Sequence, residues 1–193
     1  MEMLHHAVSL CHMLLRPYLQ QAHVVVDMTC GNGKDTVFLK RYMQDGARLY
    51  AFDIQPVAIA RTKERLLQAK VWDPSICLRC GSHEQLVLAI EENIDICVFN
   101  LGYLPKGNHD IQTTCATTIK AIKFCLHKLS ENGIIMVAAY PGTPIGKEEA
   151  LGLASFLQKL PQSMFHVSLW KPLNQIHEPP ILYIIQKRKT KGR

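Results

Sequence analysis

The sequence predicts an α/β fold with an open, mostly parallel sheet that carries helices on both faces. Short apolar runs rich in β-branched residues alternate with segments of helical length between residues 24 and 160. This alternation is typical of a parallel sheet, because each crossover helix returns the chain to the same end of the sheet. The last two apolar runs have only a loop between them, which predicts an antiparallel hairpin and seven strands in all.

The elements can be placed along the chain. Apolar residues recur near helical spacing in the N-terminal helix expected over residues 1–21. Strands are expected at Val24–Asp27, Arg48–Asp53, Ile76–Cys80, Ile94–Asn100, 133–140, Phe165–Trp170 and 181–186. Helices are expected at 34–44, 56–70, 83–90, 113–129 and 147–160.

Local signals support several of these boundaries. Pro56 suits the first turn of a helix, where its missing N–H has no partner to lose. The run Ile94–Asn100 is almost entirely apolar, as expected for a central parallel strand that is covered on both faces. Residues 141–146 are rich in glycine and proline and predict a loop.

Composition indicates an ordinary globular protein. Of the 193 residues, 48% are hydrophobic and 20% are charged, so a single domain spanning residues 1–193 is expected. No apolar run approaches the ~20 residues of a membrane span, and histidines interrupt any signal-peptide pattern in residues 1–15. We therefore expect a cytoplasmic protein with no membrane partner.

The seven cysteines are odd in number and scattered, which indicates reduced thiols. Cys77 and Cys80 form a lone CxxC pair, and they would face opposite sides of a strand. No metal site is therefore expected. The net charge of +6 and the isoelectric point near 9.0 favour a polyanionic partner. Much of that excess lies in the basic tail 187–193, which suits either phosphate contact or a solvated end.

A glycine-containing turn follows the first expected strand. Val24–Asp27 leads into Gly31-Asn32-Gly33, and the next strand ends at Asp53, twenty residues after Gly33. In open α/β sheets this order binds the nucleoside part of a cofactor, because the glycines admit the ligand to the backbone and the carboxylate binds the ribose hydroxyls. Asp27, Gly31, Asn32, Gly33 and Asp53 are therefore candidate cofactor-binding residues.

The same loop indicates which cofactor is bound. A dinucleotide loop has a third glycine where this chain has Thr36, and Asp35 in the first helical turn would repel a pyrophosphate. S-adenosylmethionine (SAM) has no phosphates. The loop resembles the Asp-x-x-x-Gly-x-Gly loop of class I methyltransferases, with Thr29 where many have a glycine. Together with the terminal hairpin, it predicts a Rossmann-like class I methyltransferase fold, whereas a nicotinamide oxidoreductase or a ligand-free turn fits less well.

The end of the fourth expected strand carries the candidate catalytic residues. Asn100-Leu101-Gly102-Tyr103-Leu104-Pro105 resembles the Asn/Asp-Pro-Pro-Tyr loop of methyltransferases that act on nitrogen. In that loop the Asn oxygen orients the target amine and the Tyr ring packs over the substrate, which implies these roles for Asn100 and Tyr103. Methyl transfer depends on such in-line placement. The candidate substrate-binding residues are Leu101, Gly102, Pro105 and Tyr140.

Three further polar residues follow strands at the same sheet edge. Ser82 and His83 come after the third expected strand, where an adenine contact is expected, and Ser82 could also cap the next helix. Gln55 could reach the ribose or adenine, or could simply precede the helix. His5, His6 and His12 on the N-terminal helix show no metal-ligand spacing and are expected at the surface.

Taken together, these motifs resemble a specific bacterial family, the tRNA 5-(aminomethyl)-2-thiouridine methyltransferases, once described as rRNA methylases. The resemblance implies SAM as donor and the aminomethyl nitrogen of the wobble uridine in a tRNA anticodon loop as acceptor. It implies cofactor contacts at Asn32, Lys34 (through its backbone), Asp53, Gln55, Ser82 and His83. The resembling segments are 25–27, 31–36, 50–55, 62–66, 82–83, 99–105, 117–122, 146–147, 174–175 and 179–180.

The chain departs from the family pattern at two places. Glu84 stands where the family often has Asp, and Pro141 and Thr143 stand where it often has His. These departures bear on the efficiency or the acceptor range of the protein if the family's histidines contact substrate. Other acceptors, namely rRNA, a protein side chain or a small amine, also stay open, as does a degenerate fold that binds RNA or SAM without turnover. Lys106, His109, Lys147 and the tail are candidate phosphate contacts. The N-terminal helix and the terminal hairpin are the surfaces that could supply a homodimer interface.

Overall fold

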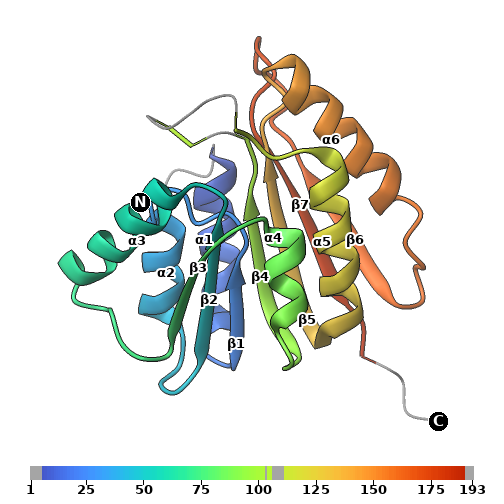
Figure 1. The fold of residues 1–193 in the computed structure, drawn as a ribbon. Helices are drawn as coiled ribbons and strands as arrows, with labels where there is room; N and C mark the ends of the chain where they lie inside the picture. Colours follow the sequence, from blue (N-terminus) through green and yellow to red (C-terminus); the bar gives the residue numbers. More distant parts are fainter. Residues whose placement is uncertain (1–5, 103, 106–110, 190–193) are drawn as a thin grey trace.

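A computed structural model describes residues 6–102, 104–105 and 111–189, and within them a seven-stranded sheet forms the centre of the protein (Figure 1). The strand order is β3-β2-β1-β4-β5-β7-β6. The strands are β1 (Val24–Asp27), β2 (Arg48–Asp53), β3 (Ile76–Cys80), β4 (Ile94–Asn100), β5 (Leu129–Ala139), β6 (Phe165–Trp170) and β7 (Ile181–Lys187). The helices are α1 (Ala7–Leu19), α2 (Lys34–Tyr42), α3 (Pro56–Gln68), α4 (His83–Leu86), η1 (Val87–Ala89), α5 (Cys115–Lys128) and α6 (Pro144–Leu157).

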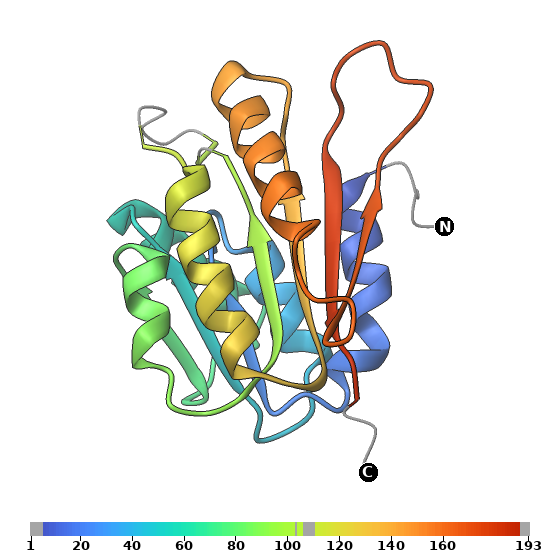
Figure 2. The same cartoon turned by 90° about the vertical axis from the view of Figure 1, so that its right-hand side faces the viewer.

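The pairing confirms the predicted class. Strands β1 to β5 pair in parallel, whereas β7 runs antiparallel between β5 and β6. The two final strands form the predicted terminal hairpin, joined by the long loop seen at the upper end of Figure 2.

Helices cover both faces of the sheet because its central strands are apolar on both sides. Val25, Ile96 and Val98 belong to one buried cluster, with α1, α2 and α3. Val26 and Phe99, which point the opposite way, belong to a second cluster with η1, α5 and α6. The N-terminal helix α1 contributes Ala7, Cys11, Leu15 and Leu19, all buried at helical spacing.

Two element boundaries differ from those expected. The strand predicted at 133–140 begins earlier, at Leu129. Leu129 already pairs with Ile94, and the register of the β4–β5 pair then shifts before the regular pairing from Ile96 onward. The helix predicted at 147–160 is α6, which begins at Pro144. Thr143 caps it by accepting a hydrogen bond from the Gly146 N–H.

The other differences are small. The helix predicted at 83–90 is a short α4 followed by the 3₁₀ helix η1, and α5 starts at Cys115 after its cap Thr114. Pro56 stands in the first turn of α3, as expected. Among the described residues, no helix is long and apolar enough to cross a membrane.

The topology fixes the place of the site. Strands β1 and β4 are adjacent, but the chain leaves β1 toward β2 on one side and reaches β4 only later. In open α/β sheets, ligands bind at the carboxyl ends of the strands, where the strand order reverses. Asp27 ends β1 and Asn100 ends β4, so both predicted motifs lie at this reversal.

Candidate cofactor and substrate site

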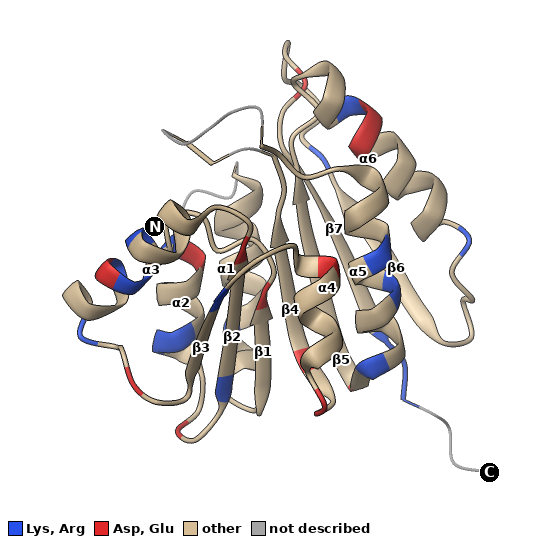
Figure 3. Ribbon diagram, in the orientation of Figure 1, with Lys and Arg blue, Asp and Glu red and all other residues tan. Residues whose placement is uncertain are grey.

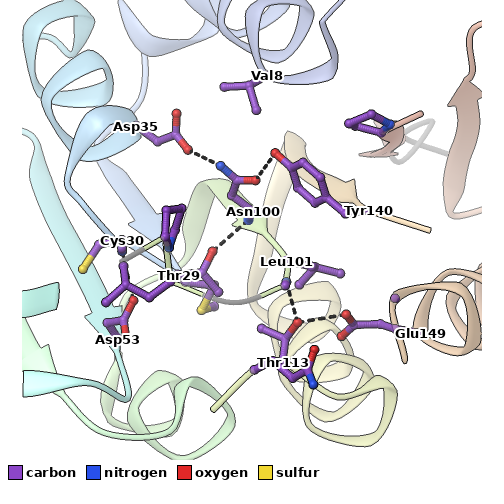
Figure 4. A pocket seen from close by; sticks show the side chains of 18 of the residues that line it. Val8, Thr29, Cys30, Asp35, Asp53, Asn100, Leu101, Thr113, Tyr140 and Glu149 are labelled. Carbon is purple, nitrogen blue, oxygen red and sulfur yellow. Dashed lines mark hydrogen bonds between the residues drawn. The ribbon is translucent and has the colours of Figure 1, made fainter. Parts of the chain in front are cut away.

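A large cavity opens at the carboxyl ends of the strands, between the two sets of helices (Figure 4). Its volume is about 1040 Å³, which is enough for a nucleoside cofactor and part of a substrate. Tyr103 lies outside the described residues. The other predicted site residues line the cavity except Asp27 and Gly33; those lining it are Gly31, Asn32, Lys34, Asp53, Gln55, Ser82, His83, Asn100, Leu101, Gly102, Pro105 and Tyr140.

The glycine loop is held in a conformation that favours glycine. Gly31 has φ of +52° and Gly33 has φ of +76°, both in the left-handed region. A Cβ built on Gly33 would lie 2.8 Å from the Thr62 Cα, so α3 packs directly against the backbone at this position. Gly33 thus packs against α3 and does not line the cavity, whereas Gly31 lines it.

We expect Gly33→Ala to lower the free energy of unfolding by about 2–4 kcal/mol, because it combines left-handed strain with overpacking against α3. Gly46→Ala is the matched control, since Gly46 has φ of +80° but no atom within 4 Å of a built Cβ. That control should lose only about 1–2 kcal/mol. Urea denaturation measures the free energy of unfolding of both variants. Equal losses in the two would show that the contact with Thr62 does not destabilise Gly33→Ala.

Asp27 supports the loop from the protein interior. Its side chain is buried and accepts hydrogen bonds from the Thr29 N–H at 3.2 Å and the Thr36 hydroxyl at 2.6 Å. Burial, reinforced by the negative charge of Asp35, raises the pKa of Asp27 to about 7. The structure thus places Asp27 behind the loop, where it bonds Thr29 of the loop and Thr36 of α2.

This pKa predicts an unusual pH dependence of stability. A carboxyl group whose pKa is raised from 3.8 to about 7 stabilises the fold below about pH 4, and this contribution is lost as the pH rises toward 7. Asp27→Asn mimics the protonated form, so its free energy of unfolding should equal that of the wild type near pH 4 and exceed it near pH 8. Between these pH values the difference should grow by up to about 1.4 kcal/mol per pH unit. Denaturation at both pH values measures the difference, and the same difference at both would contradict this prediction.

Asp53 joins the glycine loop to the start of α3. Its carboxylate accepts the Gly31 N–H and the Gln55 N–H, each at 2.9 Å, while its side chain lines the cavity. Burial raises the pKa of Asp53, and the two backbone N–H groups partly oppose that rise by favouring the charged form. A carboxylate has about four acceptor sites, so Asp53 keeps acceptor capacity for a ribose diol.

Asn32 and His83 line the cavity from the segments that follow β1 and β3. Two hydrogen bonds hold Asn32 against α3. Its side-chain oxygen accepts from Arg61 at 3.2 Å, and its backbone carbonyl accepts from Arg65 at 2.6 Å. His83 is buried against the edge of Phe99, with ring centroids 5.9 Å apart. Burial lowers the pKa of His83 and favours its neutral ring.

The Nε2 atom of His83 is a buried polar atom without a hydrogen-bond partner among the described residues. Because His83 lines the cavity, a bound ligand can supply the partner that this nitrogen lacks. Ser82 occupies the N-cap position of α4 but makes no capping bond; its hydroxyl bonds Glu84 instead. Ser82 thus stands at the N-cap position that the sequence allowed for it, but without a side-chain capping bond, and both Ser82 and His83 line the cavity as expected.

Asn100 is the centre of a polar network at the end of β4. Its side-chain N–H donates to Asp35 Oδ2 at 2.9 Å, and its oxygen accepts from the Tyr140 hydroxyl at 2.7 Å (Figure 4). The Asn100 backbone N–H also donates to the Thr29 hydroxyl at 2.7 Å. Helix α2, the loop after β1 and the loop after β5 thus each contribute a hydrogen bond to Asn100. Burial raises the pKa of Tyr140 to about 12, so its hydroxyl stays protonated.

Asp35 and His12 are members of this site that the sequence did not reveal. Asp35 was noted only as a charge that disfavours phosphate, and His12 was expected at the surface. Instead, His12 Nε2 lies 2.8 Å from Asp35 Oδ1, and its ring stacks on Phe38 with centroids 3.7 Å apart. The expected surface position of His12 is therefore wrong, because α1 packs beside α2 and turns this residue toward the cavity.

A second network that the sequence did not indicate supports the loop after β4. The Thr113 hydroxyl accepts from the Gly102 N–H and donates to Glu149, both at 2.8 Å (Figure 4). Glu149 is 3% exposed and also accepts from Thr118 at 2.9 Å. Burial raises the pKa of Glu149. Thr113 lies just before α5 and Glu149 lies on α6, and no spacing in the sequence would reveal this contact.

The charges that line the cavity suit a cationic, phosphate-free cofactor. The acidic residues on its described walls are Asp35, Asp53, Glu149 and Glu178, against Lys34 as the lining lysine or arginine. A sulfonium and an amino group are favoured in such a cavity, whereas a pyrophosphate is repelled. The glycine loop, Asp53 and the unpaired His83 nitrogen therefore fit the predicted cofactor.

Comparison with known proteins agrees with this geometry. A family model described as "Putative rRNA methylase" matches residues 49–186. A protein of Arabidopsis thaliana named tRNA (mnm(5)s(2)U34)-methyltransferase, chloroplastic, is 33% identical over 190 residues, which are 94% of this chain and 69% of the plant protein.

Solved structures show the same family over the full fold. A structure described as a putative rRNA-methylase from Clostridium thermocellum is 35% identical, with a TM-score of 0.91 and coverage of 96% of this chain and 99% of that chain. A structure described as a putative methyltransferase from Streptococcus mutans in complex with SAH is also 35% identical, with a TM-score of 0.82 and the same coverage. The chain therefore belongs to the rRNA methylase family and is a methyltransferase with the Rossmann-like class I fold.

Proposed function

We propose that the protein transfers a methyl group from SAM to the aminomethyl nitrogen of the wobble 2-thiouridine of tRNA, giving the methylaminomethyl nucleoside. The observation that carries the proposal is the Asn100 amide, held by Asp35 and Tyr140 on the wall of the same cavity as the glycine loop. The plant relative, with 33% identity, is named for the wobble-uridine reaction.

The cofactor half of the proposal uses the residues around the glycine loop. Asp53 would bind the ribose hydroxyls, Gly31 and Lys34 would approach the amino-acid tail through their backbone, and His83 would contact the adenine. When bound, SAM supplies an activated methyl group on a sulfonium. The SAH-bound relative from Streptococcus mutans, at 35% identity, supports this cofactor.

The acceptor half uses Asn100. An amide oxygen has two lone pairs, so the Asn100 oxygen can keep the Tyr140 bond and also accept an N–H of the substrate amine. That bond would aim the nitrogen lone pair along the cavity toward the cofactor end. In-line displacement depends on this placement, and burial at the site favours the neutral, nucleophilic amine. Tyr103, outside the described residues, stays the predicted stacking ring.

Basic side chains near the cavity support an RNA partner. Lys34 lines the cavity, and Arg61 and Arg65 of α3 donate to Asn32, which also lines it; Figure 3 shows blue segments on this helix. Lys147, on the opposite rim at α6, pairs with Glu178 at 2.8 Å. A wobble base in an anticodon loop can be splayed into the cavity without opening a duplex, while these cations contact its phosphates.

The test is methyl transfer from labelled SAM to three purified RNAs: tRNA that carries aminomethyl-2-thiouridine, the same tRNA without the aminomethyl group, and ribosomal RNA. The proposal predicts label only on the first. The family description names rRNA, so label on ribosomal RNA alone would move the acceptor there and overturn the tRNA assignment. Label on the tRNA without the amine would overturn the choice of nitrogen.

A further inference from the structure

The Asn100 amide has two ends that differ chemically, and only one of them helps the reaction. An oxygen turned to the substrate accepts an amine N–H and leaves the nitrogen lone pair free. An NH₂ group turned to the substrate would instead donate to that lone pair and block attack. The two orientations have the same shape, so packing alone does not select between them.

Tyr140 does not choose the orientation either. Its hydroxyl can donate to an amide oxygen or accept from an amide NH₂, so it bonds Asn100 equally well in both. Thr29 contacts only the Asn100 backbone N–H, at 2.7 Å. The choice must come from a group that is only a donor or only an acceptor.

Asp35 is such a group. As a carboxylate it can only accept hydrogen bonds, and its Oδ2 lies 2.9 Å from the Asn100 Nδ2. Its second oxygen lies 2.8 Å from the His12 Nε2, and the His12 ring is fixed by stacking on Phe38. Both carboxylate oxygens are thus engaged by groups on other elements, and Asp35 is 8% exposed as a residue. Figure 4 shows Asp35 and Tyr140 on opposite sides of Asn100.

We propose that Asp35 is a positioning residue that selects the productive orientation of the Asn100 amide, with His12 holding Asp35 in place. This inference rests on the proposed function, because it takes an amine as the acceptor. It predicts that activity depends on the hydrogen-bonding polarity at position 35, rather than on side-chain size.

Asp35→Asn tests the polarity at constant size. The Asp35 carboxylate can only accept, so His12 Nε2 is the donor in their contact. The amide introduced at position 35 therefore accepts from His12 through its oxygen, and its NH₂ group faces Asn100 and turns the Asn100 amide the wrong way. We expect the single-turnover rate of methyl transfer to fall by about tenfold or more, with SAM affinity and melting temperature near wild type. Asp45→Asn is the matched control, because Asp45 is exposed on the loop after α2.

The exchange of the two residues is the decisive variant. Asn100→Asp alone places two carboxylates 2.9 Å apart and should be strongly impaired. In Asp35→Asn/Asn100→Asp, the amide now at position 35 donates its NH₂ to the carboxylate now at position 100. The second oxygen of that carboxylate again presents an acceptor to the substrate amine. We expect the rate of the double variant to exceed the product of the two single effects by at least about tenfold. A purely structural role of Asp35 would give no such recovery.

The outcomes separate this inference from the proposed function. If wild type methylates the tRNA but Asp35→Asn keeps the wild-type rate, or the exchange variant shows no recovery, Asp35 does not orient Asn100 and the proposed function stands. If wild type does not methylate the tRNA, the proposed function fails. Side-chain amide NMR of SAM-bound protein then decides the inference: protection of the Asn100 NH₂ from exchange, lost in Asp35→Asn, supports it, and an unprotected NH₂ in wild type overturns it.

Discussion

Asn100→Ala is expected to reduce the rate of methyl transfer by about 100-fold or more while SAM affinity stays within about threefold. The substitution removes the amide that would orient the acceptor nitrogen, but none of the bonds that hold the glycine loop or Asp53. Its effect should therefore appear in the chemical step. Single-turnover kinetics and calorimetric titration with SAM measure the two quantities separately.

Asn93→Ala is the control for this variant. Asn93 is exposed at the opposite end of β4, so it is close to the same strand but not to the cavity. It should leave both quantities at the wild-type level. If Asn100→Ala also transferred methyl groups at the wild-type rate, Asn100 would have no catalytic role and the acceptor site would have to lie elsewhere in the cavity.

Asp53→Ala is expected to weaken SAM binding by about 100-fold, or about 3 kcal/mol. It removes the proposed ribose partner and leaves the Gly31 and Gln55 N–H groups without the acceptor that holds them 2.9 Å away. Calorimetric titration with SAM measures the loss. An analogue of SAM without ribose hydroxyls separates two causes. If Asp53→Ala loses as much affinity for the analogue as for SAM, the effect comes from the glycine loop alone. If it loses less, the contact between Asp53 and the ribose diol is supported.

Asp73→Ala controls for the loss of an aspartate that holds a turn. Asp73 accepts the N–H of Ser75 at 2.8 Å, much as Asp53 accepts the N–H of Gln55, but it lies away from the cavity. It should leave the SAM dissociation constant unchanged. If Asp53→Ala bound SAM with the wild-type dissociation constant, the proposed binding of the SAM ribose at Asp53 would be contradicted.

The sequence was sufficient for the fold because the decisive signals are local. The β-branched runs, Pro56 and the bare loop between the last two strands each act within a few residues, and all seven strands and the hairpin were predicted from them. The expected start of the fifth strand was wrong because pairing with β4 extends β5 back to Leu129 across an irregular register, and no local signal in the sequence reveals that pairing.

The site was predicted only in part, for a related reason. Residues that follow strands could be assigned to one sheet edge, so Asp53, His83 and Asn100 were found in advance. His12 and Glu149 come from helices whose rotation over the sheet is set by packing, and no sequence spacing relates them to β4. Asp35 was noticed for its charge, but its bond to Asn100 spans 65 positions.

The central claim is that the methyl group goes to a nitrogen held at Asn100, and the position of the methyl on the product tests it most directly. The measurement is fragmentation mass spectrometry of nucleosides from tRNA incubated with SAM and the enzyme. We predict one added methyl on the aminomethyl nitrogen of the wobble 2-thiouridine, absent with Asn100→Ala. A methyl on the ring, on the ribose or at another tRNA position would contradict this claim.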